Sequence, residues 1–190
     1  MDVQVTYFDQ KGPVNTEATL KIAQKRAKEL GIEQVVVAST YGETARKALQ
    51  IFDSSRVNVV VVTISYGFKS EGWIMEEEVR RELEEKGAKV LTSIHALGDD
   101  VSSSFSSQKG GWGANQIVAE ALRRFSQGMK VAVEITLMAA EAGLIDVEKE
   151  TISIGGTDRG VDTAIVVKPA YARNFLDFEI REILAKPRIG

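Results

Sequence analysis

The sequence predicts a three-layer α/β/α fold with a mixed, mostly parallel sheet, formed as a single domain over residues 1–190. Short β-branched and apolar runs alternate with longer segments of helical periodicity, as in proteins built from strand–helix–strand units. Hydroxyl- and glycine-rich turns follow several of these runs, where such folds place their ligands. A chain of 190 residues with 44% hydrophobic and 27% charged residues is long enough to bury the core of such a domain.

The first part of the chain is expected to alternate strand and helix. Residues 3–8 alternate in polarity like a strand, and residues 15–30 show helical periodicity between a good capping residue, Asn15, and a terminating glycine, Gly31. A short apolar run at 35–38 predicts a strand buried on both faces, followed by a helix from about Glu43 whose inner face carries Ala45, Ala48, Leu49 and Phe52.

The middle of the chain continues this alternation and then changes character. Residues 57–63 and 89–93 are predicted strands, and residues 75–86 are a charged surface helix closed by Gly87. The stretch 98–113 is rich in serine and glycine and lacks apolar periodicity, so we expect a lid, a binding loop or a disordered segment there.

The last part of the chain is expected to hold two helices and three strands. Helical patterns cover residues 115–127 and 130–142, and Gly128 is expected to separate them. The predicted strands are residues 151–156, 163–168 and 178–185.

Composition argues against several classes of function. The formal net charge of −3 gives no broad electrostatic footprint for nucleic acid or an anionic membrane. With no cysteine and one histidine, we expect neither disulfides nor a metal centre. No run reaches the ~18 apolar residues of a membrane span, so we expect a cytoplasmic protein.

The turn after residue 38 carries the strongest functional signal. Ser39, Thr40 and Thr44 can donate hydrogen bonds to phosphate oxygens, and Gly42 allows close approach of the backbone to a ligand at the start of a helix. The alternative is that these hydroxyls only cap the helix. Since the turns after Ala38, Val62, Ser93 and Ile154 should converge on one edge of the sheet, we favour the ligand. A nucleotide triphosphatase loop is excluded because no Walker lysine follows the glycine.

Three further residues have open alternatives. Arg159 can bind a phosphate or carboxylate, or fasten its own loop by pairing with Asp158 or Asp162. Glu134 lies in an apolar helix and can contact a ligand, or reach solvent or an internal basic residue. His95 is the default acid/base candidate but has no visible nucleophile beside it in the sequence.

Several of these stretches resemble a known family. The stretches that carry the resemblance are Phe8 with Asn15-Thr16, residues 35–45, Gly67-Phe68, Val133 to Thr136 with Met138 to Ala140, and Gly155-Gly156 with Arg159-Gly160 and Asp162-Thr163. They are similar to archaeal stand-alone proteins related to the C-terminal α/β domain of pyruvate kinase. The resemblance implies a pyruvate kinase C-terminal domain-like fold, with a five-stranded core sheet and one antiparallel edge strand. It also implies that pyruvate kinase activity is absent, because the catalytic barrel is missing.

The same resemblance implies a ligand. In pyruvate kinase this domain binds a sugar bisphosphate through the turn that matches Ser39, Thr40, Gly42 and Thr44. Here the basic residue that often lies in that turn is absent and Glu43 brings a negative charge, which argues against a bisphosphate but not against a monophosphate. Proteins of the stand-alone kind resemble flavin mononucleotide (FMN) binders. The expected binding residues are Ser39, Thr40, Tyr41, Gly42, Thr44, Thr63, Gly67, Phe68, Glu134, Gly156, Arg159 and Thr163.

Three functions follow as hypotheses. The first is a small-molecule binding protein for a phosphorylated ligand, FMN in particular. The second is an enzyme acting on a phosphorylated metabolite, with His95 and Glu134 as acid/base groups. The third is a regulatory or oligomerisation module, and the apolar last strand allows a homodimer in any of these cases.

Overall fold

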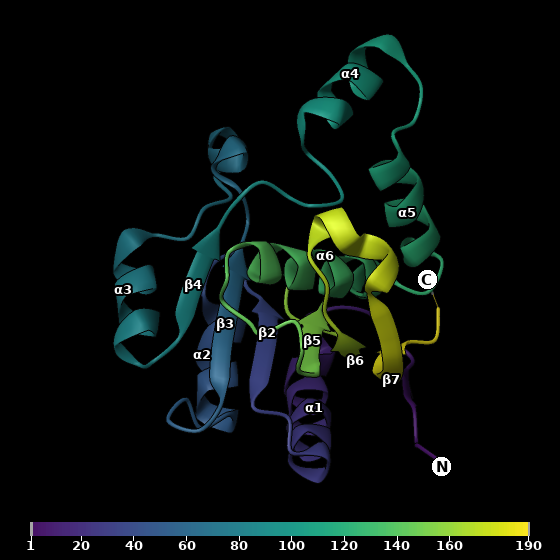
Figure 1. Ribbon diagram of the computed structural model, residues 1–190. Helices are drawn as coiled ribbons and strands as arrows, with labels where there is room; N and C mark the ends of the chain where they lie inside the picture. The colour runs from purple at the N-terminus through teal and green to yellow at the C-terminus, as the bar shows by residue number, and fades with distance from the viewer. Residues whose placement is uncertain (1, 190) are drawn as a thin grey trace.

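The computed structural model describes residues 2–189 and shows one seven-stranded sheet between layers of helices (Figure 1). The strands lie in the order β1-β7-β6-β5-β2-β3-β4, and β6 alone among them runs antiparallel to its neighbours. Their bounds are β1 Thr6–Phe8, β2 Gln34–Ala38, β3 Asn58–Thr63, β4 Lys89–Thr92, β5 Thr151–Gly155, β6 Thr163–Lys168 and β7 Glu179–Pro187. The three-layer α/β/α fold predicted from the sequence is confirmed.

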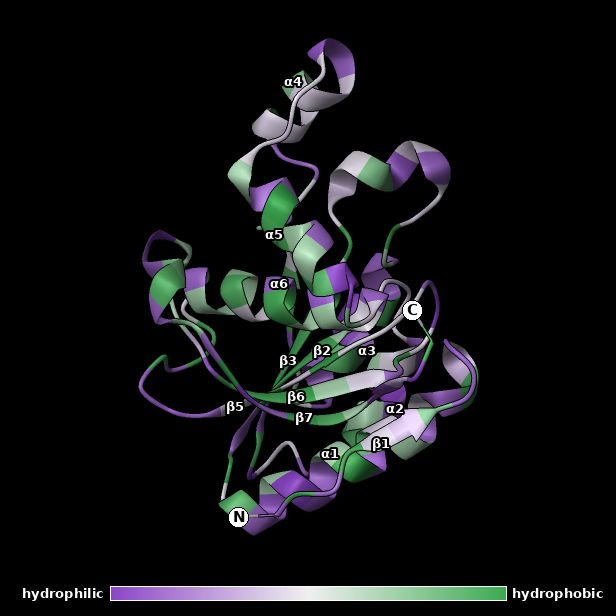
Figure 2. Cartoon of the chain, turned by 90° about the vertical axis from the view of Figure 1, so that its right-hand side faces the viewer, coloured by the Kyte–Doolittle hydropathy of each residue, from purple (hydrophilic) through white to green (hydrophobic). Residues whose placement is uncertain are grey.

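Helices cover both faces of the sheet. On one face lie α1 (Thr16–Leu30), α2 (Glu43–Ile51) and α3 (Glu77–Glu85); on the other lies α6 (Gln127–Glu141), with α5 (Ala114–Arg123) packed against it. Figure 2 shows α1 and α6 on opposite sides of the sheet and α4 (Val101–Lys109) far from it. Short 3-10 helices are η1 (Pro13–Asn15), η2 (Tyr66–Glu71) and η3 (Ala172–Asp177).

The central strand β2 explains why its sequence is apolar at every position. Val35 and Val37 pack into the core under α1 and α2, whereas Val36 faces the core under α6. All three side chains are fully buried. A strand covered on both faces has no solvent side on which polar residues could alternate.

The order of the strands creates a crevice beside β2. From β2 the chain passes through α2 to β3 on one side, whereas α6 carries the chain to β5 on the other side. The carboxyl ends of β2 and β5 therefore flank a topological switch point, where ligands bind in open α/β sheets.

The antiparallel strand β6 does not lie at the edge of the sheet, where the family resemblance implied it would be. The family resemblance implied five strands with an antiparallel strand at the edge, but β7 and β1 extend the sheet beyond β6. Residues 163–167 of β6 are buried, so an edge position would have exposed an apolar strand to pairing with other chains. The strand β7 takes that edge and is covered in turn by β1 over three residues.

The polar stretch 98–113 contains a helix, which the sequence analysis did not predict. The Asp100 side chain accepts a hydrogen bond from the Ser103 backbone N–H and opens α4, and Gly110 ends it with φ of 78°. Val101 and Phe105 lie one turn apart on this helix, and both are exposed. None of the α4 side chains is buried, which is why the sequence shows no apolar periodicity.

The boundary between α5 and α6 also differs from the prediction. Ser126, not Gly128, begins α6, since its hydroxyl accepts a hydrogen bond from the Met129 N–H. Gly128 lies in the first turn of α6, where a Cβ atom would stand 2.4 Å from Thr163 Oγ1. This glycine is required because α6 approaches β6 closely.

Neither of the longest helices of the described chain spans a membrane. Both α1 and α6 have 15 residues, and no membrane-spanning helix occurs in residues 2–189.

Replacing Gly42, which precedes α2, should destabilise the fold more than replacing Gly31, which follows α1, although both glycines have left-handed backbone angles. An added Cβ would lie 2.4 Å from Val79 Cγ1 at Gly42, but within 4 Å of nothing at Gly31. Gly31→Ala should lower the free energy of unfolding by about 1 kcal/mol through backbone strain, and Gly42→Ala by a further ~1–3 kcal/mol through overpacking. Urea denaturation measures both losses. Equal losses would contradict the close packing of Val79, on α3, against Gly42.

Candidate functional site

Two cavities meet at the carboxyl end of β2. The smaller, about 170 Å³, lies between the turn after β2 and the loop that joins β5 to β6. The larger, about 330 Å³, extends along the end of β3 and the loop after β4 toward α6. Both are lined by Ala38, Ser39, Thr40 and Val131, so they form one continuous crevice at the switch point.

The turn 39–44 is fixed from two sides. Ser39 Oγ accepts a hydrogen bond from the Ala45 N–H at 3.2 Å, in the manner of a helix cap, and Thr63 donates its hydroxyl to the Thr40 carbonyl at 3.0 Å. Gly42 has φ of 96° and opens α2. The Thr44 side chain lines the smaller cavity and makes no hydrogen bond within the described part of the chain. Thus Ser39 and Thr63 hold the turn, and Thr44 is available to a ligand.

The loop from β5 to β6 brings Arg159 over this turn. Its guanidinium carbon lies 5.4 Å from the centre of the Tyr41 ring, a cation–π contact. Within residues 2–189 Arg159 makes no ion pair with Asp158 or Asp162; Asp162 instead accepts hydrogen bonds from the Gly12 N–H and the Thr163 hydroxyl. The positive charge of Arg159 is therefore directed to the smaller cavity by an aromatic ring.

An aromatic wall lines the larger cavity. The Phe68 ring stacks on Trp73 with centroids 5.6 Å apart and on His95 with centroids 5.9 Å apart. Trp73 remains 46% exposed, which places it at the mouth of the cavity. The wall offers a flat apolar surface to a planar ligand.

His95 is held by a carboxylate four residues along the chain. Its Nδ1 lies 2.8 Å from Asp99 Oδ2. Because an ionised carboxylate only accepts hydrogen bonds, Nδ1 carries a proton and Nε2 is the ring nitrogen left for a ligand. The hydrogen bond from His95 holds the pKa of Asp99 below its ordinary value; the charges of His95, Lys130 and Arg123 act in the same direction, and burial opposes them.

Glu134 has an internal basic partner. Its Oε2 accepts a hydrogen bond from Lys130 Nζ at 2.5 Å, and its Oε1 accepts one from the Leu97 N–H at 2.9 Å. The side chains of Lys130 and Glu134 are 8% and 5% exposed. Both oxygens of the carboxylate are thus engaged, and a buried charge pair forms part of the wall of the larger cavity.

Comparison with known proteins identifies the family. A sequence profile of the family described as pyruvate kinase, alpha/beta domain, matches residues 17–167. The chain belongs to this family. Its fold is accordingly that of a pyruvate kinase C-terminal domain.

Solved pyruvate kinases share low similarity with this alpha/beta domain. A pyruvate kinase from Cryptosporidium parvum is 17% identical with a TM-score of 0.44, over 82% of this chain and 23% of that chain. A structure of the Cryptosporidium parvum enzyme in complex with ADP is 15% identical with a TM-score of 0.42, over 90% and 24%. The domain spans about a quarter of the length of these pyruvate kinases.

The crevice of the pyruvate kinase alpha/beta domain gathers most of the residues expected at its binding site. Those that line one or both cavities are Ser39, Thr40, Tyr41, Thr44, Thr63, Phe68, Glu134, Gly156 and Arg159, together with His95. Gly42, Gly67 and Thr163 line neither cavity. Gly42 shapes the turn, and Thr163 is buried, with its hydroxyl near Ser126 and Asp162.

Three residues of the larger cavity were not predicted from the sequence. Asp99, Arg123 and Lys130 all line it. The spacing of four residues in the pairs His95–Asp99 and Lys130–Glu134 was the available signal. No group of three or more His, Asp or Glu side chains suited to a metal ion occurs in residues 2–189.

Replacing His95 should raise the pKa of Asp99. The His95→Phe variant keeps a ring beside Phe68 but removes the hydrogen-bond donor, so the pKa of Asp99 should move up toward its ordinary value of 3.8. Because a lowered carboxyl pKa stabilises the fold above the unfolded value and this contribution is lost as pH falls through the folded value, the variant should lose stability mainly above about pH 4.

Carbon-13 NMR of the aspartate carboxyl groups measures this directly. Asp53 serves as an internal control, because the Ser55 hydroxyl and N–H, not His95, lower its pKa. An unchanged Asp99 titration in His95→Phe would contradict the pairing.

Proposed function

We propose that this domain binds a phosphorylated small molecule in the crevice, and that the ligand is FMN. The observation that supports this best is the pairing of two cavities of different character. A small polar cavity at a helix N-terminus continues into a larger cavity with an aromatic wall. A ligand with a phosphate at one end and a flat ring at the other matches both.

The phosphate end is assigned to the smaller cavity. The Thr44 hydroxyl and the Arg159 guanidinium are available there, and the N–H groups of Glu43 and Thr44 at the start of α2 have no acceptor within residues 2–189. The carboxylates of Glu43 and Asp158 also line this cavity. They limit the negative charge that it tolerates, which favours a monophosphate over a bisphosphate.

The ring end is assigned to the larger cavity. Phe68, Trp73 and His95 supply the stacking wall, and Val62 and Ile135 supply apolar surface. The sugar-alcohol chain of FMN would lie along Ala38 to Thr40 and Val131, where the two cavities join. We further propose that the domain has no pyruvate kinase activity, and that a homodimer is one form in which it acts.

A second candidate is an enzyme acting on a phosphorylated metabolite. The His95–Asp99 pair favours it, because a carboxylate that holds one ring nitrogen leaves the other positioned for proton transfer. Glu134 contributes less to this candidate, since both of its oxygens already have partners. In such an enzyme His95→Phe would abolish turnover but leave phosphate binding intact.

The assignment of the phosphate is tested by comparing FMN with riboflavin, which lacks it. Thr44→Val and Arg159→Gln should each weaken FMN binding by about tenfold, the effect of losing a charge-assisted hydrogen bond, and should leave riboflavin binding unchanged. Quenching of flavin fluorescence on titration gives both affinities. Arg173→Gln, at an exposed arginine of η3 outside the crevice, is the matched control.

Two results would contradict the proposal. If the parent protein fails to bind FMN, the ligand is wrong. If Thr44→Val and Arg159→Gln weaken the binding of riboflavin as much as the binding of FMN, the phosphate does not lie at the turn.

A further inference from the structure

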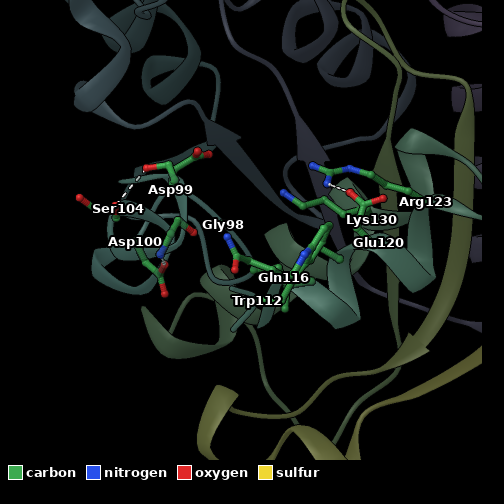
Figure 3. A pocket seen from close by; sticks show the side chains of 13 residues that line it. Gly98, Asp99, Asp100, Ser104, Trp112, Gln116, Glu120, Arg123 and Lys130 are labelled. Carbon is green, nitrogen blue, oxygen red and sulfur yellow. Dashed lines mark hydrogen bonds and ion pairs between the residues drawn. The ribbon is translucent and has the colours of Figure 1, made fainter. Parts of the chain in front are cut away.

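A third cavity, of about 540 Å³, adjoins the crevice on the side of α4 and α5 (Figure 3). We call it the arm cavity, because the helical arm formed by α4 and α5 walls it. It shares Asp99, Arg123 and Lys130 with the larger cavity of the crevice. A molecule in the arm cavity would therefore meet the crevice ligand at these three side chains.

Positive groups with spare donors line one side of the arm cavity. Lys130 is buried, and within residues 2–189 only one of its three N–H bonds has an acceptor, Glu134. Arg123 donates from Nε to Gln127 and from Nη1 to Glu120, while its Nη2 has no hydrogen-bond partner in residues 2–189. Figure 3 shows the ends of both side chains directed into the cavity from the same side.

One carboxylate with a free oxygen faces them. Asp99 uses Oδ2 for His95, and Oδ1 accepts no hydrogen bond within the described chain. The other two acids are already engaged, since Asp100 accepts from the Ser103 N–H and Asn115, and Glu120 accepts from Arg123 and Arg124. Asp99 alone of the three acids is therefore available to a ligand cation.

An apolar surface completes the arm cavity. The Trp112 side chain, 67% exposed, lines it together with Leu97 and Ala119. A large aromatic side chain left this exposed beside charged groups offers contact area that the chain itself does not cover.

We infer that the arm cavity binds a zwitterionic, amino-acid-like molecule with an apolar side chain. Its carboxylate is held by Lys130 and Arg123, its ammonium group by Asp99, and its side chain by Trp112. Opposite charges on the two sides of the cavity suit a dipolar ligand better than a simple anion, which Asp99 would repel. This site adjoins the proposed FMN crevice and shares its three charged side chains with the larger cavity there, so its occupant would be the neighbour of the crevice ligand.

The test uses Trp112 as its own reporter. The chain has two tryptophans, so Trp73→Phe leaves Trp112 as the only one and keeps an aromatic ring against Phe68. Three probes are titrated against its fluorescence: L-leucine, 4-methylpentanoate, which lacks the ammonium group, and 3-methylbutylamine, which lacks the carboxylate. Leucine should give a saturable change at the lowest concentration, at least about tenfold below either analogue.

Two variants assign the contacts. Arg123→Gln should weaken leucine at least about tenfold, whereas Arg124→Gln should not, because Arg124 pairs with the same Glu120 but does not line the arm cavity. Asp99→Asn keeps a side chain suited to φ of 56°. It should weaken the binding of leucine without weakening the binding of 4-methylpentanoate.

The inference is overturned if leucine produces no saturable change, if 4-methylpentanoate binds as tightly as leucine, or if Arg123→Gln and Arg124→Gln behave alike. FMN titration of the unsubstituted protein separates the two proposals. If that protein fails to bind FMN while leucine still gives a saturable change, the crevice ligand alone is refuted.

Discussion

The buried pair of Lys130 and Glu134 determines how the walls of the candidate site are held together. The carboxylate accepts hydrogen bonds from Lys130 on its own helix and from the Leu97 N–H on the loop that follows β4. Taking two charges out of water is costly, and the cost is offset when geometry and additional hydrogen bonds satisfy both groups. Here the pair joins α6 to the loop that carries His95 and Asp99.

Much of the site depends on that junction. His95 stacks on Phe68 and is oriented by Asp99, so the aromatic wall of the crevice is set by a loop that Glu134 anchors. The arm begins directly after this loop, at Asp100, and α4 buries none of its own side chains. A helix of nine residues without a packed face gains little stability by itself, so the loop and α5 determine where α4 lies. Glu134 thus fixes the loop from which the arm leaves the body of the domain.

The strands, most helices and one end of the site could be predicted from the sequence, because they follow local rules. The valine run of β2 is buried on both faces, and Gly31 ends α1 in a left-handed conformation. The turn 39–44 follows a buried strand and lines the crevice, as convergence of strand ends requires.

The remaining features depend on contacts between distant segments. The strand β6 lies inside the sheet because β7 pairs with it on the side away from β5. The sequence of β6 alone does not show this pairing. From the sequence, Gly128 is predicted to separate two helices, but in the structure it lies inside α6, where the helix backbone passes close to Thr163. Similarly, the contact of Arg159 with Tyr41 joins loops more than a hundred residues apart, so no local pattern could distinguish it from an arginine paired within its own loop.

Binding of FMN is tested most simply by the absorbance spectrum of the purified protein after incubation with FMN and desalting. The protein should be yellow and retain flavin absorbance, because the phosphate and the ring each have a cavity of suitable character in one crevice. A colourless protein that returns all of the added FMN to the small-molecule fraction would contradict the proposed binding.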